Sequence, residues 1–197
     1  MVNFLKTAAK FLFVSTFMLG CGGCHNSKGE SGESIEEVSL VTWEECGYQQ
    51  GEHMCDFTLK DQNGDDFSLY DHIGRPIILD YSTMWCGYCQ VAAYEVSAIQ
   101  DAYSDYDLLY VTILVEDTAG NPADETDCEN WSGLFGIIDP PVLAGSRDLL
   151  DSNGVSGVQI AGWPSFLFLT DEMVIHSTLR GYSSAGIEQG IQNIIAE

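Results

Sequence analysis

Positive charge is scarce in this sequence: its 197 residues include 7 Lys and Arg against 30 Asp and Glu, a formal net charge of −23. Surfaces that bind nucleic acid or adhere to anionic lipid need clustered cations, so the composition argues against both partners. The acidic shell is interpreted as a solubilising surface. The apolar stretch over residues 11–19 is too short to cross a bilayer as a helix.

That stretch fits the hydrophobic region of a signal peptide instead. Lys6 and Lys10 precede it, and it ends in Met18-Leu19-Gly20-Cys21, which resembles the bacterial lipobox. In signals of that kind the cysteine is acylated and becomes the new N-terminus. We therefore expect Cys21 to carry a lipid anchor that holds an acidic domain at a membrane face.

The signal divides the chain into three parts. Residues 1–20 are the expected lipoprotein signal peptide, and residues 21–42, rich in Gly, Ser and Glu, are the expected flexible tether. Residues 43–197 are long enough for one domain with its own core. The expected location is extracytoplasmic, on a bacterial membrane: the outer membrane or the periplasmic face in a Gram-negative cell.

A C-x-x-C-H pattern at the start of the tether, Cys21 to His25, also matches the c-type haem attachment signature. Acylation would consume Cys21, and the glycines and serines that follow offer no helix to surround a porphyrin. The lipid anchor is therefore the preferred interpretation, and no cofactor is expected.

Seven cysteines in an exported chain point to disulfide chemistry rather than zinc. Cys46 and Cys55 lie in an irregular stretch, and we expect them to form a structural disulfide at the start of the domain, although spacing alone does not fix connectivity. Cys128 has no obvious partner. It is expected to be buried and inert, with a bond to Cys24 or a role as an extra redox thiol as the alternatives.

Apolar patterning predicts alternating strands and helices. A hairpin is expected around Asn63-Gly64; the acidic turn lacks EF-hand spacing and is read as solvated. Residues 86–106 form a predicted helix with Ala92, Val96, Ile99, Tyr103 and Tyr106 on its apolar face. Strands are expected at 76–83, 107–115, 165–170 and 173–179, and a loop with a short helix over 139–153. A helix is expected from Asn121, with Trp131, Leu134 and Phe135. A final helix is expected to be capped by Ser184, with Ile187, Ile191, Ile194 and Ile195 on one face. This order gives an α/β sandwich around a mixed sheet.

The motif that carries chemistry is Cys86-Gly87-Tyr88-Cys89, where the predicted strand at 76–83 passes into a helix. A sulfur at a helix N-terminus is stabilised as a thiolate by the helix dipole and free N–H groups. Cys89, one turn further on, is close enough to close a disulfide. The pair therefore predicts a reversible two-electron switch, with a structural disulfide or a zinc half-site as the alternative.

Residues 55–195 resemble the thioredoxin superfamily, and most closely its membrane-tethered TlpA/ResA-like branch. The resemblance is carried by the C-x-x-C after the first core strand, by Trp163-Pro164 before the next-to-last strand, and by the segment CDFTLKDQNGDDFSLYDHIGRPIILDYSTMWCGYC. It implies a three-layer thioredoxin-like sandwich: a mixed central β-sheet with helices on both faces and an N-terminal β-hairpin extension.

The resemblance also implies roles for individual residues. Cys86 would be the attacking thiolate and Cys89 the resolving thiol. Asp80 matches the buried acid that moves protons to and from the resolving thiol, unless it is a strand-end acid bonded to backbone. Pro164 matches a cis-proline beside which an extended substrate binds, with an ordinary trans-proline that opens a strand as the alternative. The remaining implied substrate contacts are Trp85, Gly87, Tyr88 and Trp163, with core packing as the alternative for the two tryptophans.

The implied activity is reduction of disulfides in exported proteins, with protein disulfides or dithiols as substrates and an upstream thiol as electron donor. Tyr88 replaces the Pro of many relatives, so the redox potential does not carry over, and an oxidase or isomerase is the enzymatic alternative. His176 raises a non-enzymatic alternative, because a copper-chaperone relative uses a downstream His with C-x-x-x-C. The spacing here is C-x-x-C, so no metal is expected. Peroxidase chemistry is disfavoured because the solitary peroxidatic cysteine in its Thr- and Pro-rich setting is missing.

Overall fold

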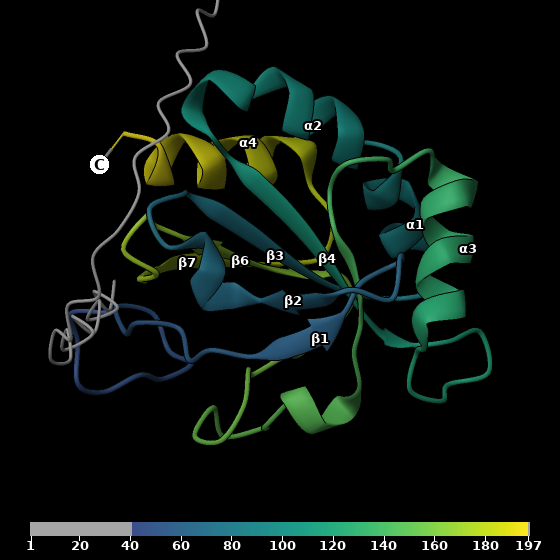
Figure 1. Ribbon diagram of the computed structural model, residues 1–197, viewed down its shortest axis with the longest axis horizontal. Coiled ribbons are helices and arrows are strands. Elements are labelled where there is room, and N and C mark those ends of the chain that lie inside the picture. Colours follow the sequence, from purple (N-terminus) through teal and green to yellow (C-terminus); the bar gives the residue numbers. More distant parts are fainter. Residues whose placement is uncertain (1–40, 197) are drawn as a thin grey trace, which may run out of the picture. The chain divides into compact units, whose positions relative to one another are not determined.

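A mixed five-stranded sheet in the order β5-β4-β3-β6-β7 lies at the centre of the domain in the computed structural model, which describes residues 41–196 (Figure 1). β3, β4 and β5 are mutually parallel, whereas β6 and β7 run antiparallel to their neighbours. The predicted signal peptide, Cys21 and nearly all of the tether lie outside the described residues. The strands are β3 (Ile77–Thr83), β4 (Leu109–Glu116), β5 (Val142–Ala144), β6 (Ser165–Leu169) and β7 (Ile175–Arg180).

The two central parallel strands are buried along their whole length. Both of their faces are covered, which explains the continuous apolar runs Ile77–Leu79 in β3 and Ile113–Val115 in β4. β5 was not expected, because the sequence indicated only a loop and a short helix over residues 139–153. Three residues are too few to show a period, and β5 exists because its backbone pairs with Thr112–Leu114 of β4.

The predicted N-terminal hairpin is present as β1 (Thr58–Lys60) and β2 (Asp66–Ser68), paired antiparallel. Its turn contains Gly64 at φ +81°, a left-handed conformation that glycine adopts readily. The Asp61 carboxylate accepts the backbone N–H groups of Asn63 and Asp65 at 2.8 and 2.9 Å. The acidic turn therefore uses its first carboxylate to hold its own backbone.

The helix predicted over residues 86–106 is two helices, α1 (Gly87–Ala93) and α2 (Val96–Ala102), followed by the 3-10 turn η2 (Ser104–Tyr106). The helix breaks at Tyr94 and Glu95, whose backbone N–H groups both donate to the Ala92 carbonyl. It leaves Tyr94 exposed while Ala92, Ala93 and Val96 stay buried. Tyr106 was expected on the apolar face and is exposed, because the chain has already left the helix there.

The boundaries of the other two helices also differ from expectation. α3 (Glu125–Phe135) begins at the capping box of Asp124 and Asp127, later than the predicted start at Asn121, whose N–H is held by Asp117. Trp131 and Phe135 are buried, but Leu134 is 67% exposed. α4 (Ser184–Ile194) is capped by Ser183, one residue before the predicted Ser184.

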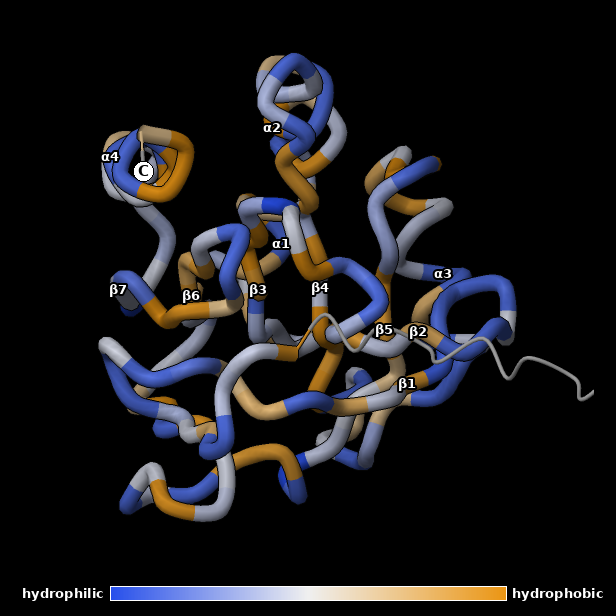
Figure 2. Tube along the Cα trace, turned by 60° about the vertical axis from the view of Figure 1, so that its left-hand side comes forward, coloured by the Kyte–Doolittle hydropathy of each residue, from blue (hydrophilic) through white to orange (hydrophobic). Residues whose placement is uncertain are grey.

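Two apolar layers enclose the sheet. Residues of all four α-helices pack with Ile78, Tyr110 and Phe166 in one cluster, and Figure 2 shows the hydrophobic residues of α4 on its inner side. The opposite face is covered by the hairpin, by the segment that precedes it (residues 41–57, the N-terminal segment), and by the 3-10 helices η1 (Leu69–His72) and η3 (Arg147–Leu149). Within the described residues, no helix is long and apolar enough to cross a membrane.

A disulfide between Cys46 and Cys55 closes the N-terminal segment, in the pairing that we expected. The segment is joined to the sheet by the Met54 N–H to Met173 carbonyl bond and by the Ile175 N–H to Glu52 carbonyl bond, at 2.8 and 2.9 Å. Met54 is buried in the second cluster. This segment and its disulfide therefore complete the layer that buries the face of β3 opposite the helices.

Two helical glycines test this packing. At Gly190 of α4 a Cβ would overlap the ring of Phe168 on β6, whereas at Gly133 of α3 a Cβ would meet nothing within 4 Å. Gly190→Ala should lower the free energy of unfolding by about 1–3 kcal/mol through overpacking. Gly133→Ala should raise it by about 0.5–1 kcal/mol through helix propensity. Urea unfolding measures both, and a Gly190→Ala protein as stable as wild type would show that α4 does not pack as described.

Candidate active site

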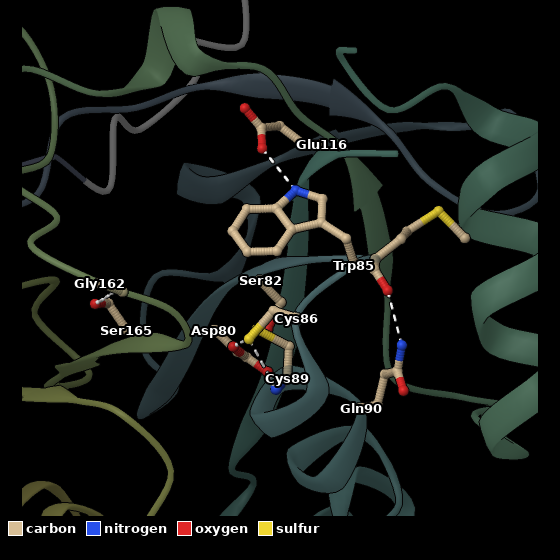
Figure 3. Close-up of a disulfide and its surroundings, with 10 residues drawn as sticks. Asp80, Ser82, Trp85, Cys86, Cys89, Gln90, Glu116, Gly162 and Ser165 are labelled. Carbon is tan, nitrogen blue, oxygen red and sulfur yellow. Dashed lines mark hydrogen bonds between the residues drawn. A yellow bond between two sulfur atoms is a disulfide. The ribbon is translucent and has the colours of Figure 1, made fainter. Parts of the chain in front are cut away.

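A disulfide between Cys86 and Cys89 lies at the junction of β3 and α1 (Figure 3). Cys86 is the N-cap residue of α1, and its sulfur accepts the backbone N–H of Cys89 at 3.2 Å. A sulfur held by an amide N–H is favoured as an anion when the disulfide opens. Cys86 is 7% exposed and Cys89 is fully buried, so Cys86 is the sulfur that a partner can reach.

Three residues around the pair face solvent. Gly87 is exposed, Tyr88 is 69% exposed and Trp85 is 48% exposed. Trp85 is nevertheless fixed, because its indole N–H donates to the Glu116 carboxylate at 2.8 Å (Figure 3). The Gln90 amide donates to the Met84 carbonyl at 2.9 Å and ties the preceding turn to α1. The disulfide is therefore bordered by exposed aromatic side chains on a rigid turn.

Asp80 is buried in the middle of β3, not at its end. Its carboxylate accepts the Ser82 hydroxyl at 2.7 Å and the Tyr110 hydroxyl at 3.1 Å. Burial raises the pKa of Asp80 to about 7, and the two hydroxyl bonds oppose that rise only in part. Since strand residues alternate, Asp80 shares a face with Ile78, which packs with Cys86 and Cys89. The acid thus lies on the side of the sheet that carries the disulfide.

The peptide bond between Trp163 and Pro164 is cis, as the resemblance implied. Pro164 leads into β6, and its carbonyl accepts the Gly181 N–H at 2.7 Å. In the described part of the chain, neither the N–H nor the carbonyl of Trp163 takes part in a backbone hydrogen bond. The backbone of Trp163 is therefore available to pair with an added extended segment.

Glu116, which the sequence analysis did not single out, connects the two tryptophans of the site. Its carboxylate is buried and accepts both the Trp85 indole N–H and the Arg147 Nε. The Arg147 guanidinium lies 6.0 Å from the centre of the Trp163 ring. Arg147 holds the pKa of Glu116 below its usual range. Sequence reasoning could have identified Glu116 from its position, because it is an acid at the end of a buried parallel strand. Ligand sites of α/β proteins lie at that edge of the sheet.

Two other residues singled out in the sequence stand apart from this chemistry. Cys128 is a buried free thiol on α3, and burial raises its pKa to about 12. Such a thiol is a poor nucleophile; Cys24, its suggested partner, lies outside the described residues. His176 lies on β7, and within residues 41–196 no group of three or more His, Cys, Asp or Glu side chains could hold a metal ion.

The sheet order, the cis-proline and the disulfide at the β3–α1 junction define a protein of the thioredoxin fold with a dithiol–disulfide pair at the usual edge of the sheet. The sequence profile of the AhpC/TSA family matches residues 50–174, which is more than half of the chain and includes both cysteines. The chain belongs to the AhpC/TSA family.

Individual relatives are more distant. Thioredoxin-like protein YneN of Bacillus subtilis is 33% identical over 61 residues, 31% of this chain, and the match spans only 36% of YneN. An uncharacterized Haemophilus influenzae protein is 26% identical over 137 residues, covering 68% of this chain and 81% of its own.

Solved structures share the fold. A thiol:disulfide interchange protein of Chlorobium tepidum has a TM-score of 0.59 at 17% identity, covering 78% of this chain and 99% of its own. The exposed lipoprotein thioredoxin of Streptococcus pneumoniae has a TM-score of 0.53 at 23% identity, covering 72% and 98%.

The burial of Asp80 predicts a pH-dependent penalty on stability. The folded-state pKa, about 7, is higher than the ordinary value of 3.8, so stability is lost as the pH rises between these two values. Asp80→Asn removes that loss and should raise the free energy of unfolding relative to wild type by up to about 4 kcal/mol above pH 7, with little gain below pH 4. Urea unfolding across this range measures the difference; a difference independent of pH would contradict the assignment.

Proposed function

We propose that this protein is an extracytoplasmic thiol–disulfide oxidoreductase that reduces disulfides of exported proteins through a Cys86/Cys89 dithiol–disulfide cycle. The observation that carries the proposal is the arrangement of the pair: an accessible sulfur that caps α1, a buried partner sulfur, and a buried acid of raised pKa on the same side of the sheet. No cofactor beyond the disulfide itself is needed, because the pair carries two electrons.

The cycle begins with the reduced pair. The Cys86 thiolate attacks one sulfur of a substrate disulfide; the substrate S–S bond breaks, the other sulfur leaves as a thiolate, and a mixed disulfide forms. Cys89 then loses its proton and attacks the Cys86 sulfur, which releases the second substrate thiolate and forms the Cys86–Cys89 disulfide. The substrate gains two electrons, the pair loses two, and a dithiol donor afterwards restores the pair.

Asp80 is the proposed acceptor of the Cys89 proton. A carboxyl group with a pKa of about 7 is partly ionised near neutral pH and can both accept and return a proton. Its hydroxyl partners Ser82 and Tyr110 fix the orientation of the carboxyl group in the disulfide form. Glu116 is unsuited to the task, since Arg147 keeps it ionised.

The substrate would bind as an extended segment beside Trp163. Backbone groups of Trp163 are free to pair with it, as in strand addition to a sheet. The exposed Trp85 and Tyr88 and the half-buried Trp163 provide apolar walls around the disulfide, with the Gly87 backbone between them. Because these contacts are largely independent of sequence, the site suits several different client proteins.

The proposed location is an extracytoplasmic membrane face, with the acylated Cys21 as the sole membrane contact and no nucleic-acid partner. The Cys46–Cys55 disulfide supports an oxidising compartment. The structures that share the fold include a secreted Mycobacterium tuberculosis disulfide oxidoreductase besides the pneumococcal exposed lipoprotein. Mass spectrometry of protein from bacterial membranes tests the anchor; an unmodified Cys21 would exclude it.

Single cysteine variants test the cycle. Cys86→Ser should abolish reduction of insulin disulfides, because the attacking sulfur is gone, while Cys128→Ser serves as a control outside the pair. Cys89→Ser should retain the attack but not the release, so that covalent mixed disulfides with clients accumulate and can be isolated from cells. Wild-type turnover by Cys86→Ser would disprove the mechanism.

The direction of the cycle is set by the reduction potential of the pair, measured by equilibration with glutathione. A reductase should lie near the thioredoxin value of roughly −270 mV, whereas a value near roughly −120 mV would make the protein an oxidase. Tyr88 is the residue to vary: Tyr88→Pro restores the residue of many relatives and should shift the potential without removing either sulfur. An oxidising wild-type value would reverse the proposed direction and leave the chemistry of the pair intact.

A further inference from the structure

Arg180 differs from the other cations of the described residues. Lys60, Arg75 and Arg147 each lie within 4 Å of a carboxylate, Asp66, Asp107 and Glu116 respectively. Among the Lys and Arg side chains of residues 41–196, only Arg180 forms no ion pair. In a chain with 30 acidic residues and a net charge of −23, an unpaired exposed arginine is a positive point in a negative surface.

The position of Arg180 places this charge beside the proposed substrate segment. Arg180 ends β7 and is paired with Ser165, the residue after Pro164. Its side chain runs along Gly162: a Cβ at that glycine would lie 3.6 Å from the Arg180 Cδ and 3.7 Å from its Cγ. Arg180 therefore flanks the Trp163–Pro164 peptide. Its strand, β7, is two strands away from β3, so the backbone of Arg180 lies about 10 Å from the end of β3 across the sheet.

Arg180 also forms part of the wall of a pocket. The pocket has a volume of about 280 Å³, and Ser165, Thr178, Gln159 and Tyr48 line it with hydroxyl and amide groups. It lies on the face of the sheet that carries Leu167, opposite the helices. A cation beside hydroxyl and amide groups is suited to an anion that needs both charge and hydrogen bonds.

We propose that Arg180 binds a carboxylate of the client protein located one residue from the client's reactive cysteine. The proposal rests on the oxidoreductase function and names the class of client: segments with an acidic residue, or a chain end, next to the cysteine. A client segment paired with the backbone of Trp163 would carry its next residue past Arg180, whose guanidinium can hold a carboxylate through two N–H groups.

Arg147 does not fill this role, although it lies near the same tryptophan, because its charge is already matched by Glu116. The preference would be local. Beyond roughly 8 Å in physiological salt the charges are screened, and the net negative surface does not attract acids. The preference therefore depends on the position of the carboxylate relative to the client cysteine and not on the net charge of the client.

The test compares peptides of equal composition. Each contains one cysteine in a mixed disulfide with thionitrobenzoate, and a Glu stands either next to the cysteine or, in the isomer, at the far end of the peptide. Thionitrobenzoate release is followed in a single turnover of the reduced full-length protein. The wild type should react about threefold faster with the adjacent isomer, the size typical of an exposed ion pair. The ratio of the two rates cancels any uniform change in the reactivity of Cys86.

Arg180→Gln should bring the ratio to one, and Arg180→Glu should invert it. Arg75→Gln is the matched control, since Arg75 precedes the opposite end of β3, and it should keep the wild-type ratio. A further peptide pair, ending one residue after the cysteine as a free acid or as an amide, separates a client chain end from an acidic side chain; a preference for either carboxylate supports the proposal.

Two failures are distinguishable. The inference about Arg180 is wrong if Arg180→Gln keeps the threefold ratio of rates, or if the wild type shows no rate preference for either kind of carboxylate. The oxidoreductase function stands in both cases. If the reduced wild type releases no thionitrobenzoate from any of the peptides, the proposed function itself fails.

Discussion

Complete burial of β3 is the constraint on which the site depends. Helices cover one face of this strand, and the N-terminal segment, fixed by the Cys46–Cys55 disulfide, helps to cover the other. Burial places Asp80 out of water, which raises its pKa to about 7, and β3 leads directly into the turn that carries Cys86 on the same side of the sheet. In the proposed cycle, the same desolvation that lowers stability at neutral pH suits the carboxyl group to proton transfer.

A comparison of Asp80 with Glu116 shows that burial alone does not decide the state of an acid. Both are buried on adjacent parallel strands. Asp80 has only two hydroxyl partners, so desolvation dominates and its pKa rises. Glu116 has Arg147 and the Trp85 indole, so the opposite charge dominates and its pKa falls. The pKa of Asp80 therefore lies near neutral pH, while Glu116 is an anion that holds the Trp85 indole and the Arg147 guanidinium.

Local signals in the sequence sufficed for the parts of the site that neighbouring residues determine. The strand-to-helix position of Cys86 and Cys89, the buried acid at Asp80 and the proline before β6 all follow from short segments of sequence and were predicted from them. The sequence could not reveal β5, whose three residues become a strand only by pairing with β4. It also could not reveal the contact of Glu116 with Arg147, 31 residues apart, or the helix break at Tyr94. These depend on tertiary packing, which overrides local pattern.

The scarcity of positive charge acquires a structural meaning at the disulfide. A surface of net charge −23 disfavours the formation of a thiolate nearby and repels anionic segments. Around the pair, however, the exposed side chains of Trp85 and Tyr88 are uncharged and the Cys86 sulfur accepts an amide N–H. Arg147 lies near the Trp163 ring, and Arg180 lies beside Gly162. Half of the cations between residues 41 and 196 thus lie beside one dipeptide. Because the charge of Arg147 is matched by Glu116, Arg180 is the cation of this pair that remains to offset the negative surface beside the disulfide.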